Sequence, residues 1–207
     1  PNIIYLEKKK FDILNLKKIN NFLKKNKIKT LVHMAALSRP MKIHKENINK
    51  SIEINIIGTA NVVRACKNNN AKLIFFSTNY VYPGKKGPYN ENDNLNPINN
   101  YGWSKLGGES AVQMYKNALI LRLCMTEKPF VHQYAFSNVT TNFMFHDDFA
   151  KIFHKLINKK GIINVGGKRQ TVFNFVKSNK KNVKKKISKD SSLDHSINIK
   201  KFKKIIG

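Results

Sequence analysis

The sequence of 207 residues has few cysteines, no long apolar run and few acidic residues, and each shortage excludes a class of protein. Its only cysteines are Cys66 and Cys124, which lie in apolar segments, so we expect core packing and neither a disulfide framework nor a metal site. No stretch approaches the ~20 apolar residues that cross a bilayer, and no apolar run follows a basic start as in a secretory signal. We therefore expect a cytoplasmic protein with no membrane partner.

The balance of charge is strongly basic, with 39 lysines and arginines against 12 acidic residues. Only four of the basic residues are arginine, the side chain best suited to reading phosphates and bases, and no helix interleaves basic with aromatic residues. We interpret the charge as lysine-rich composition and expect no specific nucleic acid partner. A nonspecific nucleic-acid binder remains an alternative, and its affinity would fall steeply with salt.

Apolar runs that alternate with helical patterns cover most of the chain. The runs that predict strands are 2–6, 11–14, 29–36, 71–82, 118–124 and 161–167. The patterns that predict helices are 15–27, 45–69, 101–117 and 147–160. Strands that are apolar on both faces and alternate with helices are typical of an α/β fold with a doubly wound parallel sheet. The alternation loosens after Cys124, which predicts a first domain over residues 1–125 and a smaller part with a basic tail over 126–207.

The segment "NYGWSKLGGE" places Tyr101 and Lys105 four residues apart. On a helix the two side chains share one face, where an ammonium stabilises a phenolate and lowers the pKa of the tyrosine. Such a tyrosine gives a proton to a carbonyl oxygen or takes one from an alcohol. Alone, this spacing is common by chance, so two neighbouring side chains on one helix face are the alternative.

The segment "FFSTNYVY" places Ser77 and Thr78 where a central strand is expected to end. Open parallel sheets build their binding crevice at the carboxyl ends of their strands. A hydroxyl group there can hold a substrate carbonyl against the tyrosine. Simple turn formation is the alternative for the same two residues.

Taken in order, these segments resemble the extended short-chain dehydrogenase/reductases, in the sugar-nucleotide branch that dTDP-4-dehydrorhamnose reductase typifies. The resemblance covers roughly residues 2–175. The segments that carry it are "FDILN", "LVHMAALSRP", "NIIGTANVVRACKNNNAKLIFFSTNYVYPG", "GPYNENDNLNPINNYGWSKLGGE" and "LILRLC". It implies a Rossmann-like NAD(P)-binding domain followed by a substrate-binding part.

The resemblance also assigns roles to individual residues. Thr78 would orient the substrate carbonyl, Tyr101 would be the general acid, and Lys105 would lower its pKa and bind the nicotinamide ribose. The remaining cofactor-binding positions that it implies are Asp12 and Ile13 at the adenine, Ala35 and Ala36 beside the cofactor, and Asn55 in a helix. For Asn55, a packing amide is an equal alternative to a proton-relay role.

The implied activity is NAD(P)-dependent reduction of a nucleotide-linked 4-keto-6-deoxy-sugar. Whether NADH or NADPH is used stays open, because Glu7 favours a free ribose hydroxyl and the lysines at 8–10 favour a phosphate. The dehydratases of this branch carry an acidic residue where Asn79 follows Thr78, which argues against dehydratase chemistry. An epimerase and a non-catalytic dinucleotide-binding or regulatory homologue remain as alternatives.

The family begins with a strand, a glycine-rich phosphate-binding turn and a helix, and no segment of this sequence matches them. We therefore interpret the chain as an N-terminally truncated piece of a longer reading frame. A homodimer through the Tyr101 helix is a further hypothesis. Side chains with the chemistry to contact the sugar or diphosphate are Arg39, Asn79, Tyr82, Arg122, His132 and Lys168.

Overall fold

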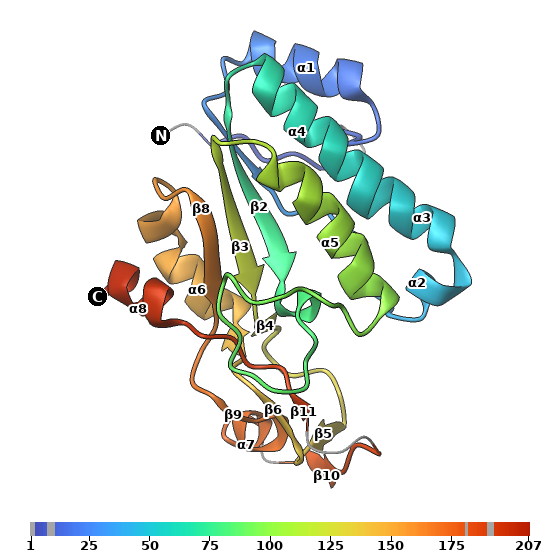
Figure 1. Cartoon of the computed structure of the whole chain (residues 1–207), viewed down its shortest axis with the longest axis vertical. Coiled ribbons are helices and arrows are strands. Elements are labelled where there is room, and N and C mark those ends of the chain that lie inside the picture. Colours follow the sequence, from blue (N-terminus) through green and yellow to red (C-terminus); the bar gives the residue numbers. More distant parts are fainter. Residues whose placement is uncertain (1–2, 8–10, 181, 190–192) are drawn as a thin grey trace.

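The computed structural model of the chain describes residues 3–7, 11–180, 182–189 and 193–207. Its centre is a parallel sheet of four strands in the order β1-β2-β3-β8. These strands are β1 (Thr30–His33), β2 (Lys72–Thr78), β3 (Ala118–Leu123) and β8 (Gly161–Val165). The α/β fold with a parallel sheet that the sequence predicts is confirmed. Because all four strands run the same way, their carboxyl ends meet at one edge of the sheet (Figure 1).

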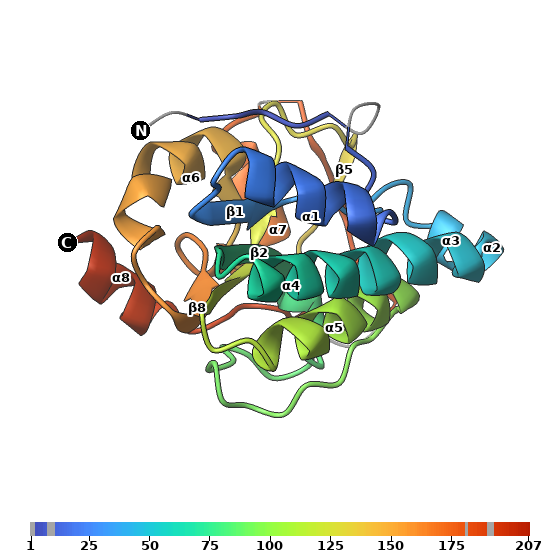
Figure 2. The same cartoon turned by 90° about the horizontal axis from the view of Figure 1, so that it is seen from above.

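Three helices cover one face of the sheet, as Figures 1 and 2 show. They are α1 (Leu16–Lys25), α4 (Thr59–Asn68) and α5 (Asn100–Gln113). Ile19 from α1, Val62 from α4 and Val112 from α5 are buried in one cluster with Phe75 of β2. Alternate strand residues face this cluster, since Ile74 packs on the other side of the sheet.

The opposite face is covered by segments from the second half of the chain. They are α6 (His146–Ile152), the short 3₁₀ helix η3 (Phe153–Leu156) and α8 (Lys200–Ile206). Phe149, Leu156 and Phe202 are buried against β3 and β8 there. The segments on either side of residue 125 therefore share one sheet, and the proposed domain boundary stays a prediction.

The long helix expected over 45–69 is divided into four pieces. They are α2 (Ile43–Glu46), α3 (Ile48–Ile52), the π-helical segment η1 (Glu53–Gly58) and α4. A π-helical turn often marks a functional site, because it rotates the side chains out of the regular helical series. This one brings the backbone oxygen of Asn55 within 2.4 Å of where a side chain at Gly108 would begin, so at Gly108 helix α5 lies directly against the backbone of η1.

The remaining elements form a smaller layer beyond the carboxyl edge of the sheet (Figure 1). They are the 3₁₀ helix η2 (Asn79–Val81), β4 (Met125–Thr126), β5 (Tyr134–Phe136), β6 (Val139–Thr141), β7 (Met144–Phe145), β9 (Gln170–Thr171), α7 (Val172–Lys177), β10 (Lys184–Lys186) and β11 (Leu193–Asp194). Phe145, Phe175 and Val176 lie in a buried cluster of their own. This layer therefore has a separate apolar core.

Two of the expected strands are wrong. Residues 3–6 and 11–14 form no strand, and Asn2 lies outside the described residues. In the arrangement that the resemblance implies, the strand at 2–6 pairs with a strand that this sequence does not supply. Without a ladder partner an apolar run gains no sheet hydrogen bonds, and Ile3 and Tyr5 are instead 68% and 85% exposed.

The predicted core packing of the two cysteines is confirmed, since Cys66 and Cys124 are both buried in apolar clusters. Burial raises the pKa of the Cys66 thiol to about 12 and that of Cys124 to about 11. Both thiols are therefore protonated at neutral pH. Across the described part of the chain, no helix is both long and apolar enough to span a membrane.

Candidate active site

Helix α5 begins at the carboxyl edge of the sheet and carries Tyr101 in its first turn. The side chain of Asn99 caps the helix by accepting a hydrogen bond of 2.8 Å from the backbone N–H of Gly102. Gly102 itself approaches the backbone of Tyr80 so closely that a Cβ atom would lie 2.4 Å from the Tyr80 oxygen. The cap and this contact fix where Tyr101 enters the site.

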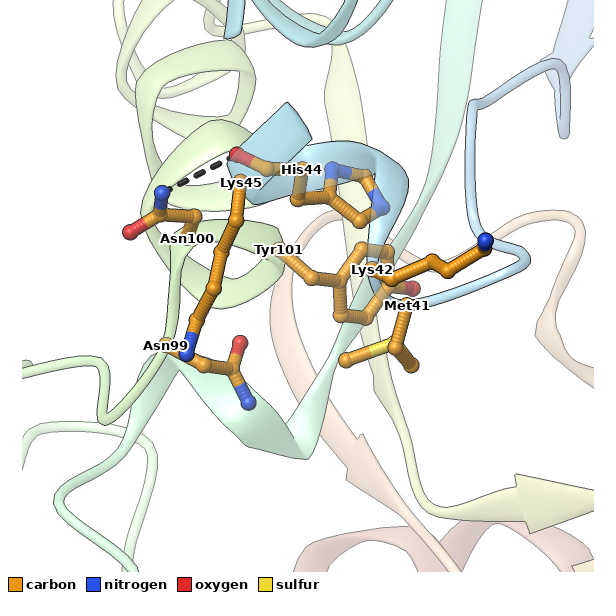
Figure 3. Close-up of a pocket in the computed structure, with 7 residues that line it drawn as sticks. All are labelled: Met41, Lys42, His44, Lys45, Asn99, Asn100 and Tyr101. Carbon is orange, nitrogen blue, oxygen red and sulfur yellow. Dashed lines mark hydrogen bonds between the residues drawn. The ribbon is translucent and has the colours of Figure 1, made fainter. Parts of the chain in front are cut away.

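The Tyr101 ring lies among other rings. Its centroid is 5.2 Å from that of His44 and 6.1 Å from that of Tyr80, and Figure 3 shows the His44 imidazole beside it. Burial raises the pKa of Tyr101, while the Thr78 side chain and the charge of Arg39 oppose the rise. The expected lowering of this pKa by Lys105 is therefore not found, because burial outweighs the charges around the phenol. The structure thus brings Thr78, at the end of β2, together with Tyr101.

Lys105 lies one turn further along α5 and is buried. Its Nζ atom sits 4.3 Å from the centre of the Phe75 ring, an arrangement that stabilises a cation. Burial nevertheless lowers the pKa of Lys105 to about 7, and the charge of Glu109 only partly opposes this. A lysine with such a pKa changes charge near neutral pH, which is common at functional sites.

His33 closes the same corner at the end of β1. Its Nε2 lies 3.0 Å from the Thr59 hydroxyl, and its ring centroid is 5.6 Å from that of Phe75. Burial and the charge of Lys105 lower the pKa of His33 to about 3, so the imidazole is neutral at pH 7. The prediction from sequence missed this residue, which gave no signal beyond its place at the end of a strand.

Asn55 connects three segments of the site. Its side chain accepts a hydrogen bond of 2.7 Å from the backbone N–H of Leu37 and donates one of 2.9 Å to the Leu37 carbonyl. It also donates to the Ser104 hydroxyl at 2.8 Å. The loop after β1 is thereby held to α5, a positioning role that fits the packing alternative and leaves the proton-relay role a prediction.

The other expected cofactor positions lie at the surface of this corner. Ala35 is exposed and Ala36 half-buried in the loop that follows β1. Asp12 is exposed, and its carboxylate accepts a hydrogen bond of 2.9 Å from the backbone N–H of Leu14. Ile13 packs towards the core and lies against Gly58. The lysines at 8–10, which bear on the choice of cofactor, lie outside the described residues.

A second buried polar cluster lies under the same helix. Arg122 of β3 donates to the Glu109 carboxylate at 2.7 Å, and the Ser77 hydroxyl donates to it at 2.5 Å. Arg122 also donates to the Tyr82 hydroxyl at 2.6 Å, which in turn donates to Asn164 of β8 at 2.9 Å. Every charge in this cluster has a partner, so we interpret it as structural. The prediction from sequence did not single out Glu109, although its position four residues after Lys105 puts both residues on one face of the helix.

This cluster accounts for two of the side chains that we considered for substrate contact, Tyr82 and Arg122. Asn79 is also committed to structure, since its amide donates to the His195 carbonyl at 3.1 Å. His132 and Lys168 are exposed. Of the six side chains considered for substrate contact, Arg39 is the one whose charge acts on Tyr101. Its guanidinium forms a bidentate ion pair with Glu127, which follows β4.

The protein-family model described as RmlD substrate binding domain matches residues 2–145. The chain belongs to this family. Its resemblance to the sugar-nucleotide branch of the short-chain dehydrogenase/reductases is thereby confirmed.

Solved structures with the RmlD-like fold cover nearly the whole chain. A dTDP-4-dehydrorhamnose reductase from Bacillus anthracis, in complex with NADP, is 23% identical with a TM-score of 0.83 over 98% of this chain and 82% of its own. A hypothetical dTDP-4-dehydrorhamnose reductase from Sulfolobus tokodaii is 25% identical with a TM-score of 0.83, covering 96% and 81%. At such identity the Bacillus structure shows a shared fold.

Curated relatives of this RmlD-family chain match it over less of their own length. A dTDP-D-glucose 4,6-dehydratase from Dictyostelium discoideum is 29% identical, covering 75% of this chain and 44% of the relative. Methionine adenosyltransferase 2 subunit beta from Danio rerio is 35% identical, covering 45% and 28%. The chain therefore spans less than half the length of these relatives.

Proposed function

We propose that this chain carries the catalytic residues for NAD(P)H-dependent reduction of a nucleotide-linked 4-keto-6-deoxy-sugar. One observation carries the proposal: a half-buried tyrosine lies beside a strand-end hydroxyl, and a buried lysine of lowered pKa lies one helical turn further along the same helix. This arrangement lies at the carboxyl edge of a parallel sheet, where such folds bind their ligands.

The residues present fit the nicotinamide end of a dinucleotide. Ala35 and Ala36 have small side chains where the loop leaves β1, which permits close approach. The role proposed for the Lys105 ammonium is to donate hydrogen bonds to the ribose hydroxyls. When bound, the reduced cofactor supplies the hydride. Asp12 and Ile13 are the positions proposed for the adenine end.

The role proposed for Thr78 and Tyr101 is to hold and protonate the carbonyl oxygen. Thr78 donates a hydrogen bond to that oxygen, and the Tyr101 hydroxyl gives it a proton as negative charge develops. Burial raises the pKa of Tyr101, so the phenol is protonated before the reaction. The role proposed for Lys105 is to make the phenolate that is left behind less costly when its amine is protonated.

The comparisons support this reaction class, because two solved relatives bear the name dTDP-4-dehydrorhamnose reductase and one holds NADP. A relative from Bordetella bronchiseptica with the same fold holds NAD, so either dinucleotide stays in the proposal. An epimerase of the same family uses the same residues and remains an alternative.

A second candidate is a non-catalytic subunit that keeps the fold for binding. The observation that favours it is the 35% identity to Methionine adenosyltransferase 2 subunit beta over 94 residues, a relative that is named as a subunit. This candidate predicts dinucleotide or protein binding without turnover.

Homodimerisation through α5 is a separate proposal, and light scattering on the purified chain tests it.

Calorimetry with NADH and NADPH tests the proposal first. We expect binding of one or both, followed by oxidation of the bound cofactor when a 4-keto-6-deoxy-sugar nucleotide is added. Tyr101→Phe removes the proton donor and keeps the ring, so we expect kcat to fall at least 100-fold with cofactor binding unchanged. Binding without turnover in the wild type would support the subunit, and no binding at all would refute the proposal for this chain.

A further inference from the structure

A pocket of about 280 Å³ opens beside Tyr101, between α2 and the start of α5. It is lined by Met41, Lys42, His44, Lys45, Asn99, Asn100 and Tyr101. Figure 3 shows the His44 imidazole next to the Tyr101 ring, with the chains of Lys42 and Lys45 extending on opposite sides. The Asn100 amide donates to the His44 carbonyl at 2.9 Å, which holds α2 against α5.

His44 has one buried ring nitrogen without a partner. Its Nδ1 lies 2.7 Å from the Ser51 hydroxyl, which fixes the orientation of the ring, and the residue is only 1% exposed. The Nε2 atom makes no hydrogen bond, and within the described residues no other buried side-chain nitrogen or oxygen is in this state. Leaving such an atom unpaired costs on the order of 1 to 3 kcal/mol. Because Nε2 has almost no accessible surface, the pocket lining must shift before a bound group satisfies this nitrogen and gains affinity.

The chemistry of the pocket selects what that group is. Burial lowers the pKa of His44, so the imidazole is neutral at pH 7 and offers no charge to an anion. Whether Nε2 donates or accepts depends on the tautomer, and a hydroxyl group satisfies either case. The side chain of Met41 and the ring of Tyr101 supply the apolar surface that the C–H face of a sugar covers.

The rim of the pocket suits the rest of a nucleotide sugar. Lys42 and Lys45 are exposed there. Lys42 lies 3.7 Å from the Glu46 carboxylate, which does not line the pocket, and no ion pair is found for Lys45 within the described residues. Their charge complements the diphosphate that joins the sugar to its nucleoside. A volume of 280 Å³ lies near the lower limit of small-molecule sites and suits one sugar ring rather than a whole nucleotide.

We infer that this pocket is a sugar subsite in which His44 Nε2 hydrogen-bonds a hydroxyl group of the nucleotide-linked hexose. The inference deepens the proposed function and rests on it for the identity of the ligand. His44 is thus a specificity-determining residue, because a sugar without a hydroxyl group at that position leaves Nε2 unpaired.

The first test is nitrogen-15 NMR of the His44 imidazole in the whole chain, with dTDP-glucose as probe and dTDP as its control. We expect dTDP-glucose to shift the Nε2 signal and dTDP to leave it unchanged. A shift with dTDP alone would place the nucleotide in the pocket, and no shift with either compound would mean that water is the only partner. Either of these results overturns the inference.

The second test compares variants by calorimetry with the same two compounds. His44→Phe keeps a ring against Tyr101 and removes both nitrogens, so we expect about tenfold weaker binding of dTDP-glucose and unchanged binding of dTDP, which corresponds to ~1.4 kcal/mol. His44→Gln, whose amide reaches a similar position, should recover part of the loss. Equal affinity of His44→Phe and wild type for dTDP-glucose refutes the subsite.

These outcomes are separable from failure of the proposed function. Wild type that binds dTDP-glucose through His44 and never oxidises NADH or NADPH would refute the reductase and keep the subsite. Wild type that reduces a keto-sugar nucleotide with a KM unaffected by His44→Phe would refute the subsite and keep the reductase. Circular dichroism of each variant shows whether it has folded, and the NMR test on wild type needs no variant.

Discussion

Helix α5 buries two opposite charges one turn apart, and the surroundings of the two differ completely. Glu109 accepts hydrogen bonds from Arg122, Ser77 and Gln113. Among the described residues, no carboxylate lies within ion-pair distance of Lys105. The Lys105 ammonium instead lies over the Phe75 ring, near His33, which is neutral at pH 7. The same helix face thus carries a fully paired charge and an unpaired one.

The difference between these two buried charges distinguishes a structural residue from a candidate functional one. A buried ion pair with every hydrogen bond made is costly to break, and it fixes how β3, β8 and the loop over residues 83–100 pack. A buried lysine without a counter-ion costs stability, and a folded protein keeps it where a ligand or reaction uses it. We therefore propose that Tyr101 and Lys105 form the catalytic end of α5, whereas the hydrogen bonds of Glu109 make the other end structural.

The largest expected effect on stability comes from breaking the buried ion pair between Glu109 and Arg122. Glu109→Gln leaves the Arg122 charge buried without a counter-ion, so we expect the free energy of unfolding to fall by about 3 to 5 kcal/mol. Urea denaturation measures it. The double variant Glu109→Gln, Arg122→Met removes the orphaned charge and should recover part of the loss. A single variant as stable as wild type would contradict the structural role.

The next effect comes from separating α5 from η1 beside Asn55. A Cβ atom at Gly108 would lie 2.4 Å from the backbone oxygen of Asn55, so Gly108→Ala must move the helix. We expect a loss of about 1 to 3 kcal/mol. Gly107→Ala is the matched control, because its Cβ meets only the flexible end of Ile56. Equal stabilities of the two alanine variants in urea would show that the contact with Asn55 is not restrictive.

Lys105, the unpaired charge of α5, should make the stability of the protein depend on pH. The pKa of Lys105 is about 7 in the folded chain, well below its usual value, so the unfolded state binds more protons above pH 7. The stability of wild type should therefore rise with pH above 7, by at most about 1.4 kcal/mol per pH unit. Lys105→Met removes this slope and should be the more stable protein at pH 6. Parallel pH profiles for the two proteins would show that Lys105 keeps an ordinary pKa.

The smallest effect is expected at the ion pair beside Tyr101. The Arg39 hydrogen bond holds the pKa of Glu127 at about 2, below its unfolded value, so the pair stabilises the fold above about pH 4.5 and loses its effect as pH falls towards 2. Arg39 is 55% exposed, so Glu127→Gln should cost less than ~1 kcal/mol at pH 7. Unfolding at 0.05 and 0.5 M salt checks it, since screening should shrink the difference. A larger, salt-independent loss would mean that Glu127 is more than a surface partner.

The fold was largely predictable because its apolar patterns are strong. The runs that became β1, β2, β3 and β8 are apolar on both faces, which a covered parallel sheet requires. The run at 2–6 has the same composition and forms no strand, because a strand also needs a partner in the ladder. The composition of a segment indicates its tendency to form a strand. It does not show whether a neighbouring strand is present to pair with it.

The candidate site was predictable where it depends on spacing along one helix. Tyr101 and Lys105 share a face because they are four residues apart, and Thr78 follows from the end of β2. His44 was missed because its stretch, "KIHKE", has the composition of a solvated surface. Nothing in that composition shows that the ring is buried against Tyr101.

By itself the sequence determined the parallel sheet, the buried faces of its helices and the position of Tyr101 and Lys105 one turn apart on one helix. Those features depend on periodicity, which is local along the chain. Only the tertiary structure decided which buried charges and ring nitrogens find partners. Arg122 lies 13 residues after Glu109, and Tyr101 lies 57 residues after His44, so packing alone decides that Arg122 forms an ion pair with Glu109 and that the second pair leaves a buried His44 nitrogen without a partner among the described residues.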